Sequence, residues 1–198
     1  ISSPLNRWWW DVLENGPSSR FASHFDVDWE ASEASPANRI LLPVLGDHYG
    51  RVLEQGDLQI QRRGQYFLAC YFEHEFPLAP RSLVQILHKA AQRLGSDELA
   101  FLGDCLHSLP LPTVRDRKTR KRRHRNKETI FRYVLAFLES CPKARETVDA
   151  VLAEIHHDPD ALDHLLEQQN YRLSFWRLAG RDIGYRRFFD INTLVGLR

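Results

Sequence analysis

Three consecutive tryptophans near the start of the chain stand among polar side chains that suit carbohydrate binding. Residues 6–20 read NRWWWDVLENGPSSR. Aromatic faces stack on the apolar faces of pyranose rings, while carboxylates, amides and arginines hydrogen-bond the ring hydroxyls. The stretch therefore predicts a sugar-binding loop, with the alternative that at least one tryptophan is a core anchor. Its candidate substrate-binding residues are Trp8, Trp9, Trp10, Asp11, Glu14 and Asn15.

The end of the chain has a similar composition. Residues 171–177 and 185–192 combine aromatic rings, arginines and an acid-amide pair in short segments that follow neither a helical nor a strand period. Arg186 and Arg187 are suited to donate in a fork to sugar hydroxyls, or to hold a neighbouring carboxylate in its ionised form. The alternative is a buried Arg–Asp pair that orders a loop.

A strip of positive charge occupies residues 115–127, which hold nine Lys and Arg against one Asp and leave 18 basic and 25 acidic residues elsewhere. Clustered cations can bind a phosphate backbone through counterion release. The strip has no interleaved aromatic residue for base stacking and no recognition-helix pattern. We therefore interpret it as a solvated, mobile linker between two helices, with nucleic-acid binding as the alternative.

The sequence predicts neither a metal site nor a cofactor. His156 and His157 are adjacent, so their side chains point in different directions along a helix. The cysteines lack metal-type spacing and have apolar neighbours, which indicates reduced thiols in a cytoplasmic protein. They are Cys70, Cys105 and Cys141.

Composition limits the class of protein. With 198 residues, 43% of them hydrophobic and 27% charged, the chain can bury a substantial core and is not of disordered composition. It has no apolar run of about 18 residues and no signal-peptide pattern, so no membrane span is predicted. The absence of Met and the start at Ile1 indicate a piece of a longer polypeptide.

The candidate residues need elements to position them. Residues 1–38 show no sustained period and contain several Pro and Gly, which predicts a long irregular pocket loop with one helical turn near residues 9–13. Residues 39–45 predict a strand, after which Asp47 caps a short helix that ends near Gly56.

A β-hairpin is predicted next. Residues 58–61 and 66–72 flank a turn in which Gly64 takes a positive φ. Together with the strand at 39–45, the hairpin predicts a small sheet within residues 39–75.

From residue 82 the pattern becomes helical, with apolar residues at helical spacing and a cap before several segments. Ser82 and Gln85 have the spacing of a capping box. The five predicted helices start at Ser82, Ser96, Asn126, Pro142 and Asp158. They predict a helical bundle over residues 82–168, followed by a return segment over 169–198. The expected fold class is therefore α+β, mainly α, in a single domain over residues 1–198.

Three motifs carry a resemblance to a known family. Residues 6–20, residues 42–50 (LPVLGDHYG) and residues 185–198 (YRRFFDINTLVGLR) resemble the internal region of the maltooligosyl trehalose synthase family, which belongs to the α-amylase superfamily. The motifs occur in family order and lie toward both ends of the chain. The helical middle, with the basic strip, has no motif that can be matched.

The resemblance implies a (β/α)8 barrel in the parent enzyme, with this chain inserted between barrel strands 3 and 4. It also implies an isomerase that converts the reducing-end α-1,4 link of a maltooligosaccharide into an α,α-1,1 link by intramolecular glucosyl transfer. The superfamily's catalytic carboxylates lie on strand 4 and after strands 5 and 7. No catalytic residue is therefore expected here, and the isolated chain is expected to be inactive.

The resemblance also implies the partners and the binding residues. The expected partners are the maltooligosaccharide and the rest of the barrel, without membrane and without nucleic acid. The matched positions expected to line or support the substrate pocket are Trp8, Trp9, Trp10, Asp11, Glu14, Asn15, Asp47, His48, Tyr49, Tyr185, Arg186, Arg187 and Asp190. A free-standing carbohydrate-binding module and a nucleic-acid-binding helical protein that uses residues 115–127 are the alternatives.

Overall fold

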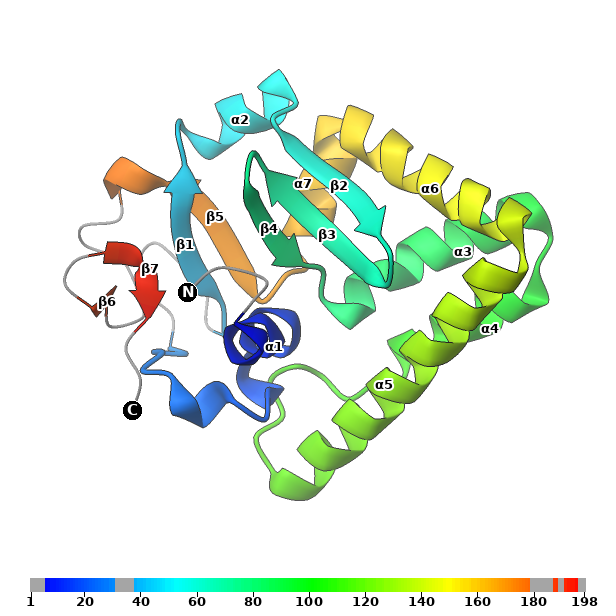
Figure 1. Ribbon diagram of the computed structural model, residues 1–198, viewed down its shortest axis with the longest axis horizontal. Coiled ribbons are helices and arrows are strands. Elements are labelled where there is room, and N and C mark those ends of the chain that lie inside the picture. Colours follow the sequence, from blue (N-terminus) through cyan, green and yellow to red (C-terminus); the bar gives the residue numbers. More distant parts are fainter. Residues whose placement is uncertain (1–5, 31–37, 179–186, 189–190, 196–198) are drawn as a thin grey trace.

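The computed structural model describes residues 6–30, 38–178, 187–188 and 191–195, which are mainly helical with three small sheets (Figure 1). The helices are α1 (Arg7–Asn15), α2 (Tyr49–Gln55), α3 (Leu83–Leu94), α4 (Asp97–His107), α5 (Arg117–Ser140), α6 (Pro142–His157) and α7 (Pro159–Leu166). The strands are β1 (Ile40–Leu45), β2 (Leu58–Arg63), β3 (Tyr66–Tyr71), β4 (His74–Pro77), β5 (Tyr171–Phe175), β6 (Arg187–Phe188) and β7 (Ile191–Val195). The mainly α prediction is confirmed.

The predicted hairpin is present, but the predicted sheet is wrong. Strands β2 and β3 pair antiparallel, Gly64 has a φ of 56°, and β4 extends this sheet to three strands. Strand β1 does not join it. It pairs in parallel with β5, so that Ile40 lies opposite Tyr171. A parallel partner requires a long crossover, so the local pattern around β1 could not reveal it.

The predicted helices are present, but two of their predicted caps are wrong. The side chains of Ser96 and Asp158 cap α4 and α7 as predicted. Ser82 precedes α3 but makes no capping hydrogen bond, because its hydroxyl donates to the carbonyl of Ala79. Asp47 likewise does not cap α2, which His48 precedes. Helix α3 packs against α4 and α6, α5 packs against α4 and α6, and α7 packs against α6, so the five helices form the predicted bundle.

The linker interpretation of the basic strip is wrong. Helix α5 starts at Arg117 rather than Asn126, and it is 24 residues long. Lys and Arg have favourable helix propensities, and the Asp116 carboxylate accepts a hydrogen bond from the Thr119 N–H at 2.8 Å. Arg123 and His124 of the strip are buried. The nine residues 117–125, which were expected to be a solvated linker, are therefore helical. Two of them, Arg123 and His124, belong to the protein interior.

The helical turn predicted near residues 9–13 is present, and it is longer than expected, because α1 runs from Arg7 to Asn15. In α1, Trp9, Val12 and Leu13 recur at helical spacing and are buried, and the Asn6 side chain accepts a hydrogen bond from the Trp9 N–H at 3.2 Å. The helix ends at Gly16, which has a φ of 59°. The polar and aromatic residues around this apolar stripe concealed the amphipathic pattern.

The apolar faces of α1, of the β1–β5 and β2–β3–β4 sheets and of the bundle contribute to one hydrophobic core. No helix in residues 6–30 and 38–178, or in the short described pieces beyond them, has the length and apolar character to span a membrane.

Candidate functional site

The three tryptophans of α1 have different environments. Trp9 is 1% exposed and packs edge-to-face on Phe25, with the ring centroids 5.0 Å apart. It is therefore a core anchor and not a ligand contact, which confirms the packing alternative for this position. Trp8 is 49% exposed and stacks on Phe21. Trp10 is half-buried and borders a cleft.

This cleft, the α1–α5 cleft, has a volume of about 710 Å³ and lies between α1, the tip of the β2–β3 hairpin and α5. The rings of Trp10 and Tyr66 meet edge-to-face, with their centroids 5.9 Å apart. The aromatic and charged residues that line the cleft are Arg7, Trp10, Glu14, Tyr66, Phe67, Lys127, Glu128, Phe131, Arg132 and Glu139. Of the residues predicted for sugar binding, Trp10 and Glu14 line this cleft, and apolar rings lie there beside paired charges.

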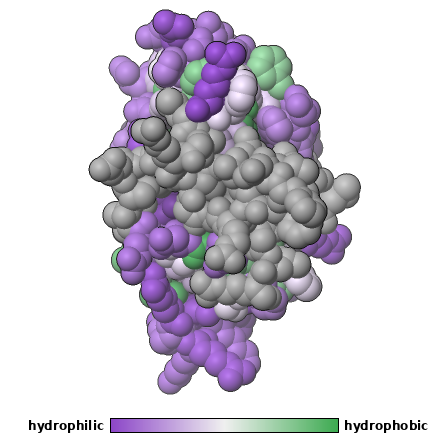
Figure 2. Space-filling model, turned by 90° about the vertical axis from the view of Figure 1, so that its left-hand side faces the viewer, coloured by the Kyte–Doolittle hydropathy of each residue, from purple (hydrophilic) through white to green (hydrophobic). Residues whose placement is uncertain are grey.

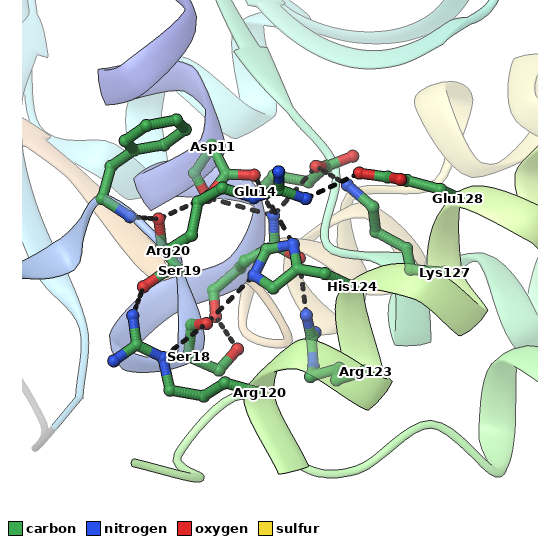
Figure 3. A network of polar contacts seen from close by, with 12 residues as sticks. Asp11, Glu14, Ser18, Ser19, Arg20, Arg120, Arg123, His124, Lys127 and Glu128 are labelled. Atoms are coloured by element: carbon green, nitrogen blue, oxygen red, sulfur yellow. Dashed lines mark hydrogen bonds and ion pairs between the residues drawn. The ribbon is translucent and has the colours of Figure 1, made fainter. Parts of the chain in front are cut away.

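An ion pair joins α1 to α5 at the inner end of the cleft. The Lys127 ammonium donates to Glu14 at 2.5 Å, and the two side chains are 11% and 17% exposed. The amide of Asn15 donates to carboxylate oxygens of both Asp11 and Glu14. Figure 3 shows these α1 acids facing the basic side chains of α5. Part of the basic strip thus neutralises the acids of the N-terminal helix.

Two residues of α5 continue this network inward. Arg123 is 1% exposed; its Nη1 donates to Asn15 Oδ1 at 2.5 Å and its Nε to the Pro110 carbonyl at 3.0 Å. Burial lowers the pKa of Arg123 to about 10. His124 Nε2 lies 3.0 Å from the Ser18 carbonyl, and burial lowers the pKa of this imidazole.

Two of the predicted site residues are hydrogen-bonded within the protein. Asn15 is fully buried, and Asp11 accepts hydrogen bonds from Ser19 and Asn15. These two polar groups are committed to partners inside the protein and support the cleft instead of lining it. These partners were not predicted from the sequence, although the acids Asp11 and Glu14 and the cations within residues 120–127 have complementary charge.

The second group of predicted residues follows the carboxyl end of β1. The Asp47 carboxylate accepts a hydrogen bond from the His48 N–H at 2.7 Å, which lowers the pKa of Asp47. The Tyr49 hydroxyl donates to Asp163 at 2.8 Å, and burial together with this carboxylate raises the pKa of Tyr49. The exposed His48 ring lies 5.1 Å from the ring of Phe175 at the end of β5.

The carboxyl ends of β1 and β5 therefore form a second polar-aromatic surface, the β1–β5 platform. Its residues are His48, Phe175, Trp176 and Arg177. Arg177 lies over the ring of Trp176 at 5.2 Å, and Trp176 is 51% exposed. Neither Trp176 nor Arg177 was among the residues predicted for the site, although the 171–177 segment was singled out.

Helix α1, which lines the cleft, and the carboxyl ends of β1 and β5, which carry the platform, lie at opposite ends of the β1–β5 pair (Figure 1). The Asn170 amide, just before β5, donates to the carbonyls of Leu13 and Glu14, so the end of α1 lies at the amino ends of both strands. Six residues of β1 span about 20 Å. The described residues therefore do not bring the α1 group and the Asp47–Tyr49 group into one pocket.

The last group of predicted residues lies mostly outside the described residues. Tyr185, Arg186 and Asp190 lie outside the described residues, and of Arg187 only the backbone, in β6, is described. Their predicted roles stay predictions. Within the described part of the chain, no group of His, Cys, Asp and Glu side chains is arranged to hold a metal ion.

Comparison with known proteins identifies relatives for this arrangement. No protein-family model matches the chain. Over 63 residues, 28% of this chain, it is 43% identical to proteins assigned as maltooligosyl trehalose synthases in two strains of Mycobacterium tuberculosis. A solved glycosyltrehalose synthase matches 97% of the chain in fold, with a TM-score of 0.50 and 16% identity. A solved maltooligosyl trehalose synthase matches 99% of it, with a TM-score of 0.49 and 21% identity.

The chain spans a small part of the proteins it resembles. The aligned segment is 8% of each Mycobacterium relative, and the structural match covers 16% of the glycosyltrehalose synthase. Sequence similarity over one segment and a shared fold over nearly the whole length point to the same proteins. The chain is therefore similar in sequence to one segment of these maltooligosyl trehalose synthases, and it shares its fold with one part of the glycosyltrehalose synthase.

Proposed function

We propose that this chain is part of an enzyme that converts the reducing-end α-1,4 link of maltooligosaccharides into an α,α-1,1 link. The observation that carries the proposal is the 43% identity over 63 residues to maltooligosyl trehalose synthases. The fold shared with a glycosyltrehalose synthase over 97% of the chain supports it. Such an enzyme is an isomerase of trehalose biosynthesis.

In this proposal residues 1–198 form one domain inserted between strands 3 and 4 of a (β/α)8 barrel. A retaining transfer needs one carboxylate as nucleophile and one carboxylic acid to protonate the leaving oxygen. The barrel supplies both, and the chain alone has no turnover. Its task is to hold the released glucose in place and to exclude water until the anomeric hydroxyl attacks.

The surface that performs this task is the α1–α5 cleft. Trp10 and Tyr66 offer ring faces for a glucose unit, and Glu14 and Lys127 are within reach of its hydroxyls. The ion pair keeps both charges fixed, so that a sugar hydroxyl can accept from the ammonium and donate to the carboxylate without reorganisation of either group. Trp8, Tyr185, Arg186, Arg187 and Asp190 remain proposed pocket or pocket-supporting residues. Asp47, His48 and Tyr49 remain proposed only as supporting residues, because they lie at the far end of the β1–β5 pair.

Loss of reducing ends tests the reaction. Formation of an α,α-1,1 link consumes the reducing end of maltopentaose, whereas hydrolysis creates a new one. The longer protein that carries this chain is expected to remove reducing ends with little release of glucose, and the 198-residue chain alone is expected to leave them unchanged. An increase in reducing ends with the longer protein, or turnover by the chain alone, would refute the proposal.

A free-standing carbohydrate-binding module is the second candidate, and the same cleft favours it. It differs in predicting that the 198-residue chain alone binds maltopentaose with at least millimolar affinity. Isothermal titration of the chain decides this, because the absence of heat at millimolar sugar removes the candidate.

Nucleic-acid binding is the third candidate function, and one observation supports it. The exposed cations just before α5 and in its first turns are Arg115, Arg117, Lys118, Lys121, Arg122 and Arg125. Figure 2 shows the lower end of the molecule, where Figure 1 places the first turns of α5, as strongly hydrophilic. This candidate requires binding that weakens steeply with salt and disappears when these residues are neutralised.

A further inference from the structure

The side chain of Asn15 has polar partners at both ends of its amide. It is fully buried, and its amide nitrogen donates to the Asp11 carbonyl at 3.1 Å, to Asp11 Oδ1 at 3.1 Å and to Glu14 Oε2 at 3.0 Å. Its amide oxygen accepts a hydrogen bond from Arg123 Nη1 at 2.5 Å. The Asn15 amide therefore connects a buried cation of α5 to a carboxylate that lines the α1–α5 cleft.

The orientation of this amide depends on Arg123. A carboxamide keeps nearly the same shape after a half-turn that exchanges its oxygen and its nitrogen, so its hydrogen-bond partners decide which end faces which group. A guanidinium can only donate, and an ionised carboxylate can only accept. In the exchanged orientation the amide nitrogen would face the donor Arg123, and the amide oxygen would face the acids Asp11 and Glu14. Arg123 thus turns the N–H groups of Asn15 toward the two acids.

Arg123 is itself fixed in the interior. It is 1% exposed, and its Nε donates to the Pro110 carbonyl at 3.0 Å. It precedes Lys127 by four residues, so both side chains extend from the same face of α5 toward α1 (Figure 3). Burial lowers the pKa of Arg123 to about 10, and the charges of Glu14 and Asp11 oppose this shift, so the group is a cation at neutral pH.

The bonds to Glu14 leave one of its carboxylate oxygens for a ligand. The Asn15 amide and the Lys127 ammonium both donate to Oε2. Glu14 lines the cleft, and its side chain is 17% exposed. Since both bonds end on the same oxygen, Oε1 is the oxygen that a hydroxyl of a bound glucose unit would meet.

We propose that Arg123 is a positioning residue for the substrate: through the Asn15 amide it holds Glu14 with Oε2 on Lys127 and Oε1 turned toward the glucose unit. This role rests on the proposed function, because it requires that the cleft binds the glucan. Arg123 is not among the described residues that line the cleft, so its effect on the substrate passes through Asn15 and Glu14. A carboxylate oriented in advance does not have to reorganise when the hydroxyl arrives.

Two substitutions at Arg123 separate positioning from structural support. In Arg123→Lys the ammonium can still only donate, so Asn15 keeps its orientation. In Arg123→Gln the new amide can also accept, so both orientations of Asn15 become possible. Both variants lose the guanidinium and are expected to lose similar stability in urea unfolding. In the proposed parent enzyme, Arg123→Gln should lower kcat/KM for maltopentaose about tenfold, whereas Arg123→Lys should stay within about threefold of the wild type.

Arg120→Gln is the matched control on the same helix. Arg120 lies three residues before Arg123, and its guanidinium donates to the carbonyls of Ser18 and Ser19 instead of Asn15. The substitution makes the same chemical change without touching the amide that orients Glu14. It is expected to leave kcat/KM near the wild-type value.

Two further variants test the path through Asn15 and Glu14. Asn15→Asp keeps an acceptor for Arg123 but removes the donor to Glu14, so it should also lower kcat/KM about tenfold. In a Glu14→Gln background, Arg123→Gln should add less than about a twofold loss, because Arg123 acts through the Glu14 carboxylate.

Equal kcat/KM in the wild type and Arg123→Gln would overturn the positioning role. So would equal losses in Arg123→Lys and Arg123→Gln, or independent losses at Arg123 and Glu14. If neither Arg123 variant folds, wild-type activity of Asn15→Asp has the same consequence. A wild-type parent enzyme that consumes no reducing ends of maltopentaose would instead refute the proposed function, and the positioning role with it.

Discussion

Lys127 Nζ lies 2.5 Å from Glu14 Oε2, and this pair fastens the basic half of α5 to the N-terminal helix. The contact explains why a segment with nine cations in 13 residues becomes part of a folded helix. Burial of the pair between α1 and α5 also fixes one wall of the α1–α5 cleft.

Removal of one partner of this pair should cost more than removal of both. Lys127→Met leaves the Glu14 carboxylate largely buried without its cation, so we expect a loss of about 2–3 kcal/mol in the free energy of unfolding. Urea unfolding of Lys127→Met, Glu14→Gln and the double variant measures the coupling. The exposed pair Arg20–Glu128 is the control, and Arg20→Gln should cost less than about 1 kcal/mol. Strictly additive losses at Glu14 and Lys127 would contradict this account.

Stability should fall in mild acid because of His124. Burial holds its pKa below the ordinary value of 6.5, so the unfolded chain binds a proton before the folded chain does as the pH falls. This contribution is complete above about pH 7 and is lost progressively as the pH drops through 6.5 toward the lower folded pKa.

His124→Gln should therefore flatten the dependence of the unfolding free energy on pH between about pH 7 and pH 5. The exposed His157→Gln should leave the slope as in the wild type. The measurement is urea unfolding at several pH values. An equal slope in the wild type and in His124→Gln would show that His124 is not the cause.

Gly16 should tolerate no side chain. Its φ is 59°, and a Cβ there would lie 2.8 Å from the Oδ1 atom of Asn170, whose amide bonds the end of α1. We expect Gly16→Ala to cost about 3 kcal/mol from backbone strain and displacement of Asn170. Gly64 has a similar φ of 56° but open space around it, so Gly64→Ala should cost about 1 kcal/mol. Equal losses in thermal or urea unfolding would mean that Asn170 imposes no steric limit.

The local elements could be predicted from the sequence because their signals are local. The hairpin at Gly64, the glycine that ends α3 and the Asp158 cap before α7 each depend on a few neighbouring residues. Only one turn of α1 was predicted, because tryptophans and acids surround its narrow apolar stripe and the burial of Trp9 in the tertiary structure stabilises its full length.

The site could be predicted only in part, because its arrangement depends on contacts between distant residues. Asn15 and Arg123 meet across 108 positions, and β1 pairs with a strand more than 120 residues later. No local pattern reports such contacts. The sequence therefore located the polar-aromatic segments, whereas the structure separates them into the α1–α5 cleft and the β1–β5 platform.

Two tryptophan substitutions test the central claim most directly, because Trp10 borders the α1–α5 cleft and Trp176 the β1–β5 platform. In the proposed parent enzyme, maltopentaose conversion would be followed through loss of reducing ends. We predict that Trp10→Ala lowers kcat/KM about tenfold or more, since one lost ring contact is worth about 1.4 kcal/mol, while Trp176→Ala stays near the wild type. A loss confined to Trp176→Ala, with Trp10→Ala unchanged, would contradict the account.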